Sequence, residues 1–77
     1  EDTWGSDIVT AAALHLGAAT PQRAIMNVCD LSGYVAPRLD PQGPTREAGH
    51  ISPPSGPGLG ITPDPDRLGA PVLDLSA

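Results

Sequence analysis

The chain has 77 residues, with 9 glycines, 10 prolines, one cysteine and no phenylalanine. Its four basic residues, all arginine, face nine acidic ones and leave a net charge of −5, which excludes nucleic acid and anionic membranes as expected partners because both bind cationic surfaces. One cysteine allows no internal disulfide, and the most apolar stretch, residues 8–19, is shorter than the roughly 20 residues of a membrane span.

The chain is short, poor in large apolar side chains and without an initiator methionine. A core built from so few large side chains does not offset the entropy of ordering the whole chain, so we expect a piece of a larger protein or a segment that stays partly disordered alone. The opening Glu1-Asp2 lacks the basic segment of a secretory signal. The expected compartment is therefore the cytoplasm.

The composition changes near residue 38, since five glycines or prolines precede Leu39 and fourteen follow from there to the end. We therefore divide the chain into residues 1–38, which have the pattern of a supersecondary unit, and residues 39–77, which have the pattern of loops and an extended tail.

The first predicted element is a helix over residues 8–19. Ser6 and Asp7 are good caps before a run rich in alanine and leucine. The run carries two apolar stripes at helical spacing, which predicts burial on most of its faces. Pro21 disfavours helical backbone at Thr20, so the helix is expected to end near Ala19.

The second predicted element is a strand over residues 24–29, because this short and mostly apolar run is typical of a strand buried on both faces. Helix, tight turn and strand are half of a βα repeat, which indicates an α/β fold. Asp30 would follow the strand, and Glu1-Asp2 would precede the helix. Both acidic groups then lie at the rim where parallel α/β folds bind ligands.

The second half alternates turn signals with short apolar pairs. Its prolines exclude a second helix of ordinary length before about residue 64. We expect a hairpin-like excursion and an extended final piece over residues 71–75. The run Gly56-Pro57-Gly58-Leu59-Gly60 suggests a phosphate loop, but Pro57 removes a backbone donor and no helix follows, which favours a turn with positive φ.

The remaining candidates for chemistry have mostly structural explanations. His15 lies mid-helix among apolar neighbours without a second ligand at helical spacing, and His50 lies in a proline-rich loop, where we expect it to be solvated. Cys29 is expected to fill the core, since nothing cationic adjoins it to lower the pKa of its thiol. The acidic turn 64–66 has too few ligands for calcium. Trp4 could equally line a ligand pocket or fill the top of the core.

Residues along the whole chain together resemble a known family. They are Glu1-Asp2-Thr3-Trp4-Gly5-Ser6-Asp7-Ile8, the run from Ala11 to Thr20 followed by Pro21, Cys29-Asp30, Pro57-Gly58-Leu59-Gly60-Ile61 and Leu68-Gly69-Ala70-Pro71-Val72. In this order they resemble the carboxyl-terminal end of enolase-superfamily enzymes of the mandelate racemase and muconate lactonizing type. Within that type they are similar to the branch of cis-3-hydroxyproline dehydratases and hydroxyproline betaine epimerases.

The resemblance implies an α/β fold, namely the C-terminal fragment of a modified TIM (β/α) barrel. Glu1-Asp2 would end the seventh strand, residues 5–19 would form the seventh helix, and residues 24–29 would form the eighth strand. The Pro/Gly-rich tail would return from the barrel to the α+β capping domain. The expected partners are thus the rest of the barrel, the cap and, in the full-length protein, further copies in a homo-oligomer.

The resemblance also implies a chemistry. The family abstracts the proton next to a substrate carboxylate, stabilises the resulting enediolate anion on Mg²⁺ and, in this branch, uses lysines as acid and base. Its metal ligands and lysines lie on earlier strands, and this chain contains no lysine. We therefore expect no catalytic residue and no metal ligand here, with Mg²⁺ bound only by the full-length protein.

The resemblance implies that Asp2 or Glu1, together with Asp30, binds the small carboxylate substrate, and Trp4 is a further candidate because of its place beside Glu1-Asp2. Asp2, or else Glu1, would hydrogen-bond the substrate or a catalytic lysine, Asp30 would pair with a substrate ammonium, and Trp4 would line the pocket. The leading function is a fragment, inactive alone, of a racemase, epimerase or dehydratase with a proline derivative as candidate substrate. The alternatives are an acidic, Pro/Gly-rich interaction segment that folds on a partner, and a barrel that binds without chemistry.

Overall fold

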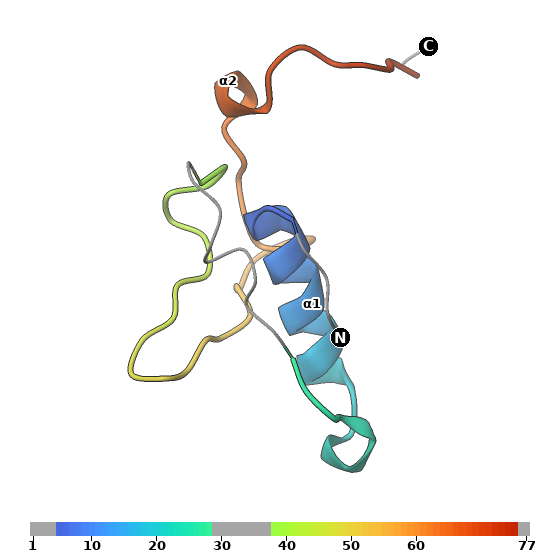
Figure 1. Ribbon diagram of the computed structural model, residues 1–77, viewed down its shortest axis with the longest axis vertical. Coiled ribbons are helices and arrows are strands. Elements are labelled where there is room, and N and C mark those ends of the chain that lie inside the picture. Colours follow the sequence, from blue (N-terminus) through green and yellow to red (C-terminus); the bar gives the residue numbers. More distant parts are fainter. Residues whose placement is uncertain (1–4, 29–37, 76–77) are drawn as a thin grey trace.

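The computed structural model describes residues 5–28 and 38–75. Its elements in chain order are the helix α1 (Asp7–Ala19), the short 3₁₀-helix η1 (Gln22–Ala24) and the one-turn helix α2 (Pro65–Leu68). In Figure 1, α1 lies at the centre, with loops to one side of it, and the final segment runs away from it past α2. Within the described ranges the fold therefore consists of α1, two much shorter helices and loops.

The predicted boundaries of α1 are confirmed. Ser6 is the N-cap, and its Oγ accepts the N–H of Ile8 at 3.2 Å. At the other end Thr20 has extended backbone, with ψ of 135°, as expected for a residue before proline. The Thr20 hydroxyl donates to the carbonyl of Leu16 at 2.6 Å, which satisfies one carbonyl left open at the helix end.

The helix buries one face rather than most of them. Its buried residues are Asp7, Thr10, Ala11 and Leu14. These follow the spacing i, i+3, i+4, i+7 of a single helical face. Leu16, on another face, is 65 % exposed, so the expectation of burial on most faces is wrong for the described structure.

The predicted strand is not formed over residues 24–28, the part of it that the structure describes. Residues 22–24 form η1, and residues 25–28 have no partner strand within the described ranges. Met26 is 99 % exposed and Val28 is 41 % exposed. Ile25 has extended backbone, with φ of −99° and ψ of 124°, but a strand needs neighbouring chains for its N–H and C=O groups. The apolar pattern is present, but residues 5–28 and 38–75 contain no strand to pair with it.

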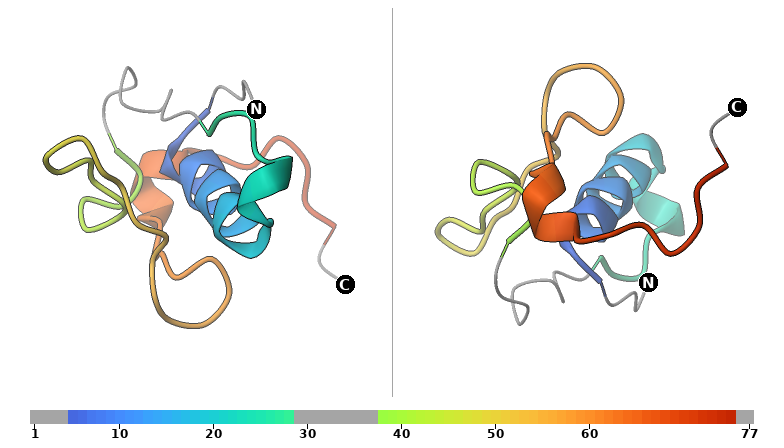
Figure 2. Two further views of the ribbon diagram at one scale, coloured as in Figure 1. Left: turned by 90° about the horizontal axis from the view of Figure 1, so that it is seen from below. Right: turned by 90° about the horizontal axis from the view of Figure 1, so that it is seen from above.

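Residues 38–52 lie to one side of α1 in all three views of Figures 1 and 2, while η1 lies at the C-terminal end of the helix. The predicted hairpin-like excursion, which comprises residues 42–62, is confirmed at its tip. Glu47 and His50 exchange two backbone hydrogen bonds of 2.7 and 2.9 Å around Ala48 and Gly49, both with positive φ. His50 is exposed, as expected.

The glycine-rich run forms the predicted turn, because Gly56, Gly58 and Gly60 all have positive φ. The turn is tied to α1 by His15, whose Nε2 lies 2.9 Å from the carbonyl oxygen of Leu59. Since a carbonyl only accepts, Nε2 is the donor in this contact. His15 thus has the structural role that its position in the helix predicts.

The acidic turn near residue 64 begins a helix instead of remaining a plain turn. Asp64 is the N-cap of α2, and its Oδ1 accepts the N–H of Asp66 at 3.0 Å. Beyond α2 the chain is exposed up to residue 75, including Val72, Leu73 and Leu75. No second helix of ordinary length occurs within residues 5–28 and 38–75, in line with the proline content.

Candidate functional site

The substrate-binding residues expected from the sequence, Glu1, Asp2, Trp4 and Asp30, lie outside the described residues, as does Cys29. The structure does describe the chain on either side of them, at Gly5, Val28 and Arg38. Two buried carboxylates, those of Asp7 and Asp40, bind the backbone of residues 39, 40, 42 and 62.

Asp7 joins the start of α1 to the second half of the chain. Its side chain is 3 % exposed, and its carboxylate accepts two backbone N–H groups, from Leu39 at 3.0 Å and from Asp40 at 2.7 Å. The Nε of Arg38 lies 3.7 Å from Oδ2 of the same carboxylate. A buried carboxylate needs such donors, because leaving it without them costs several kcal/mol. The three contacts fix residues 38–40 to the first turn of α1.

Asp40 continues the network into the excursion. Oδ1 accepts the N–H of Gln42 at 2.9 Å and Oδ2 accepts the N–H of Thr62 at 2.8 Å. These hydrogen bonds, that from Thr62 first and that from Gln42 second, hold the pKa of Asp40 below its ordinary value of 3.8, with a further contribution from the charge of Arg38 and against the effect of burial. The carboxylate is therefore ionised in the folded protein at neutral pH.

The lowered pKa of Asp40 predicts a pH-dependent contribution to stability. A group whose pKa is lower in the folded state stabilises it fully above the unfolded value, here near 3.8, and loses this effect as pH falls through the folded value. We expect Asp40→Asn to lower the unfolding temperature of the protein at neutral pH. The difference from wild type should then shrink steadily below pH 3.8.

Thermal unfolding followed by circular dichroism across this pH range measures the difference. Asp66→Asn, which changes an exposed carboxylate on α2, is the matched control and should leave the unfolding temperature almost unchanged at every pH. A gap between wild type and Asp40→Asn that stays constant into strong acid would contradict the assignment.

Two arginines complete the network around residues 38–40. Arg38 donates from Nη2 to the carbonyl of Pro44 at 2.7 Å and from Nη1 to the hydroxyl of Thr45 at 3.0 Å. Arg67 donates from Nη1 to the carbonyl of Arg38 at 2.6 Å, and the N–H of Asp64 donates to the carbonyl of Leu39 at 2.7 Å. Segments before and after the excursion are thereby joined at one place.

The sequence analysis did not predict this network, although two parts of it follow from neighbouring residues in the sequence. Asp7 in the first helical turn already has a local explanation, since an acidic group is favourable beside a helix N-terminus. Asp40-Pro41-Gln42-Gly43 is a turn signature, and its local bonds from Gln42 and Gly43 do form. The contacts over 22 to 33 residues, to Thr62 and from Asp7, have no such signal.

The two carboxylates are a poor fit for a metal ion, because every one of their four oxygens accepts a backbone N–H. Elsewhere in the described ranges no group of three or more His, Cys, Asp or Glu side chains could hold a metal. The described residues therefore do not supply a site for Mg²⁺.

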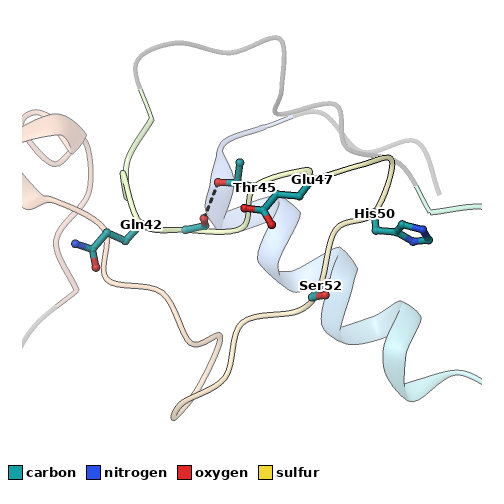
Figure 3. Close-up of a pocket in the computed structure, with 6 residues that line it drawn as sticks. Gln42, Thr45, Glu47, His50 and Ser52 are labelled. Carbon is teal, nitrogen blue, oxygen red and sulfur yellow. Dashed lines mark hydrogen bonds between the residues drawn. The ribbon is translucent and has the colours of Figure 1, made fainter.

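An open, polar pocket of about 450 Å³ lies beside the excursion. In Figure 3, Thr45 and Glu47 of its lining lie between Gln42 and His50, whose side chains extend away from each other. The Thr45 hydroxyl donates to the carbonyl of Gly43 at 3.2 Å and also accepts from Arg38. Its donor is therefore already used in a hydrogen bond within the loop. The pocket shows no convergent set of polar groups for a ligand.

An apolar groove of about 290 Å³ runs between α1 and the segment after η1. One side is lined by Ala13, Leu16 and Gly17 of the helix and by its C-cap Thr20, and the other side is lined by residues 24–28. The close approach depends on Gly17, since a Cβ there would lie 3.0 Å from a methyl group of Val28. The groove thus brings together the predicted helix and the predicted strand.

Comparison with known proteins identifies the family. Residues 2–67 match the family described as enolase C-terminal domain-like. The chain is 44 % identical over 76 residues to cis-3-hydroxy-L-proline dehydratase of Roseibium aggregatum, covering 99 % of the chain and 21 % of that protein. It also matches the crystal structure of a mandelate racemase/muconate lactonizing enzyme from Roseovarius nubinhibens ISM, with a TM-score of 0.77 and 42 % identity.

The structural match covers 94 % of this chain and 20 % of that one, so the chain spans about a fifth of the length of these relatives. No helix among the described residues is long and apolar enough to cross a membrane. The family match extends over most of the chain, and the sequence relative and the structural relative each match nearly all of it. The chain belongs to the enolase superfamily, in the enolase C-terminal domain-like family, and is of the mandelate racemase and muconate lactonizing enzyme type.

Proposed function

We propose that this chain supplies the C-terminal part of a Mg²⁺-dependent racemase, epimerase or dehydratase that abstracts the proton α to a substrate carboxylate. The proposed substrate class is a proline derivative. The observation that carries the proposal is 44 % identity to cis-3-hydroxy-L-proline dehydratase over 99 % of the chain. The fold similarity, with a TM-score of 0.77, supports the same type of enzyme.

In this proposal residues 1–38 contribute the end of the barrel, and residues 39–77 contribute the loop and the tail toward the cap. Asp2, or else Glu1, hydrogen-bonds the substrate or a catalytic lysine, Asp30 pairs with a substrate ammonium, and Trp4 lines the pocket. A carboxylate at hydrogen-bond distance from an ammonium gives a charge-assisted bond about twice as strong as a neutral one. In this proposal the chain binds substrate and supplies neither the acid nor the base, because both are lysines in this branch and the chain contains none.

The metal and the acid and base groups belong, in this proposal, to parts of a longer protein. Mg²⁺ would polarise the substrate carboxylate there and stabilise the anion left after proton abstraction. The exposed apolar side chains of Leu16, Met26 and Val28 support such an arrangement, since a barrel and cap around them would remove apolar surface from water. A homo-oligomer of the longer protein is part of the same proposal.

The isolated 77-residue chain is expected to be inactive, and the longer protein that carries it is expected to be active. Proton NMR in D₂O with cis-3-hydroxy-L-proline and Mg²⁺ distinguishes the reactions: racemisation or epimerisation replaces the α-proton by deuterium, and dehydration removes the hydroxyl group as water. Loss of activity with EDTA and recovery with Mg²⁺ is the control.

A longer protein that lacks strand-end carboxylates and a lysine-bearing strand, and that shows neither reaction with a panel of proline derivatives, would contradict the proposal. Folding of the chain on a separate partner would instead favour an interaction segment.

A further inference from the structure

We propose that residues 62–68 form a strap that opens and closes as one unit against residues 38–40. Three polar contacts between described residues join the two segments, and in each the strap is the donor: Thr62 N–H to Asp40 Oδ2 at 2.8 Å, Asp64 N–H to the Leu39 carbonyl at 2.7 Å, and Arg67 Nη1 to the Arg38 carbonyl at 2.6 Å. All the acceptors belong to residues 38–40, so the strap can separate from them along a single line of contact.

The strap is stiff in itself. Pro63 and Pro65 each fix one backbone angle. Oδ1 of Asp64 accepts the N–H of Asp66 at 3.0 Å, and its carbonyl accepts the N–H of Arg67, also at 3.0 Å. The Nε of Arg67 lies 3.6 Å from Oδ2 of Asp64. None of these contacts involves residues 38–40, so we expect the strap to keep its shape when it separates from them.

The surface on which the strap closes is fixed independently of the strap. The N–H groups of Leu39 and Asp40 donate to the carboxylate of Asp7, at 3.0 and 2.7 Å. The side chain of Asp7 is 3 % exposed and belongs to the first turn of α1. Opening of the strap leaves these two hydrogen bonds in place, and residues 38–40 therefore stay attached to the helix.

The hold on the strap is polar. No residue of 62–68 is buried among the described residues, and its one leucine, Leu68, is 55 % exposed. A hydrogen bond contributes little net stability where water replaces it on opening. Segments held by such bonds, without buried apolar side chains, open at a lower free energy than the core. Gly69 ends the strap with φ of +76° and nothing within 4 Å of the position of a Cβ, so no packing restrains that end.

Closure of the strap sets the direction in which the final segment, residues 70–75, leaves the rest of the chain. In Figure 1 this segment continues from α2 and runs away from α1. Its Val72, Leu73 and Leu75 are exposed. The closed strap thus presents an apolar end in one direction, and the open strap releases it.

The test is residue-resolved hydrogen exchange in the full-length protein that carries this chain, with each variant read at an amide that it does not touch. Arg67→Ala removes the bond to the Arg38 carbonyl, and we expect it to lower the protection factor of the Thr62 amide about fivefold, as loss of one ordinary hydrogen bond would. Asp40→Ala removes the acceptor of Thr62 and should lower protection of the Asp64 amide by a similar factor. Protection of the amides of residues 39 and 40 should stay at the wild-type level in both variants.

Arg23→Ala, which changes an exposed cation on η1, is the matched control and should leave all these protection factors unchanged. Wild-type protection of Thr62 in Arg67→Ala would overturn the inference, because the contacts would then open one by one. Equal protection of Thr62, Asp64 and the buried Leu14 of α1 in wild type would also overturn it, since the strap would then open only when the whole fold does. None of these measurements uses enzymatic activity, so the result does not depend on the function proposed above.

Discussion

Asp30→Asn in the longer protein is expected to lower kcat/KM for an ammonium-bearing substrate by roughly 30-fold or more. The change keeps the size of the side chain and removes the charge that would face the ammonium. Loss of one member of a desolvated, hydrogen-bonded charge pair costs about 2 kcal/mol or more, which corresponds to that factor. Steady-state kinetics with cis-3-hydroxy-L-proline measures it, and the effect should be mainly in KM.

Two controls test whether the loss in Asp30→Asn comes from the missing charge pair with the substrate ammonium. A carboxylate analogue without the ring nitrogen should bind wild type and Asp30→Asn almost equally, because it has no ammonium to pair. Asp66→Asn, an exposed change of the same kind on α2, should leave the kinetics unchanged. An unaltered kcat/KM in Asp30→Asn would remove Asp30 from the substrate site, and Asp2 would become the leading partner for the ammonium.

Gly60→Ala is expected to destabilise the protein by about 2–4 kcal/mol, because two costs add at this position. Gly60 has φ of +76°, which side chains with L configuration rarely adopt. A Cβ there would also lie 2.8 Å from both the Cβ of Pro54 and the backbone carbonyl oxygen of Ser55, and neither of these atoms can move without moving the chain. Urea unfolding of the purified protein measures the loss.

Gly58→Ala is the matched control in the same turn. Gly58 has φ of +63°, and a Cβ built on it meets nothing within 4 Å. This variant should therefore show only the backbone cost of about 1 kcal/mol. If the two variants lose the same stability, the tight packing of Gly60 against Pro54 and Ser55 contributes nothing, and the turn is looser in solution than in the structure.

The parts of the fold that depend on neighbouring residues were predictable from the sequence. The start of α1 depends on Ser6 as the N-cap, and its end depends on Pro21. Residues adjacent to each end of the helix therefore determine where it begins and ends. The same holds for Gly56, Gly58 and Gly60, where the absence of a side chain indicates positive φ. Local stereochemistry determines each of these features.

The features that were wrong or missed depend on distant partners. Residues 24–28 have the apolar pattern of a strand, but a strand forms only with neighbours that accept and donate its hydrogen bonds. This chain spans about a fifth of its relatives, and in our proposal those neighbours belong to the remaining barrel. The side chain of Asp7 reaches the backbone of residue 40 across 33 positions, and nothing in either local sequence indicates that contact.

The identity of the family was accessible from the sequence because it rests on motifs spread over the whole chain, whereas the contacts of Asp7 were not. Asp7 reads locally as a residue of the first helical turn, and only the structure shows that its oxygens accept from Leu39 and Asp40. An acidic residue at position 7 is already explained by the helix N-terminus, so nothing in the sequence pointed to these longer contacts.

The two hydrogen bonds that the Asp40 carboxylate accepts, from Gln42 and Thr62, affect which changes in length the chain between them can tolerate. One carboxylate closes the loop between Gln42 and Thr62, so the two ends of the loop stay together whatever lies between them. The entropy of closing a loop rises only with the logarithm of its length, and the exposed turn at Ala48 and Gly49 is the natural place for extra residues. Insertions and deletions there should be tolerated among homologues, and a short epitope tag placed there should leave the rest of the chain undisturbed.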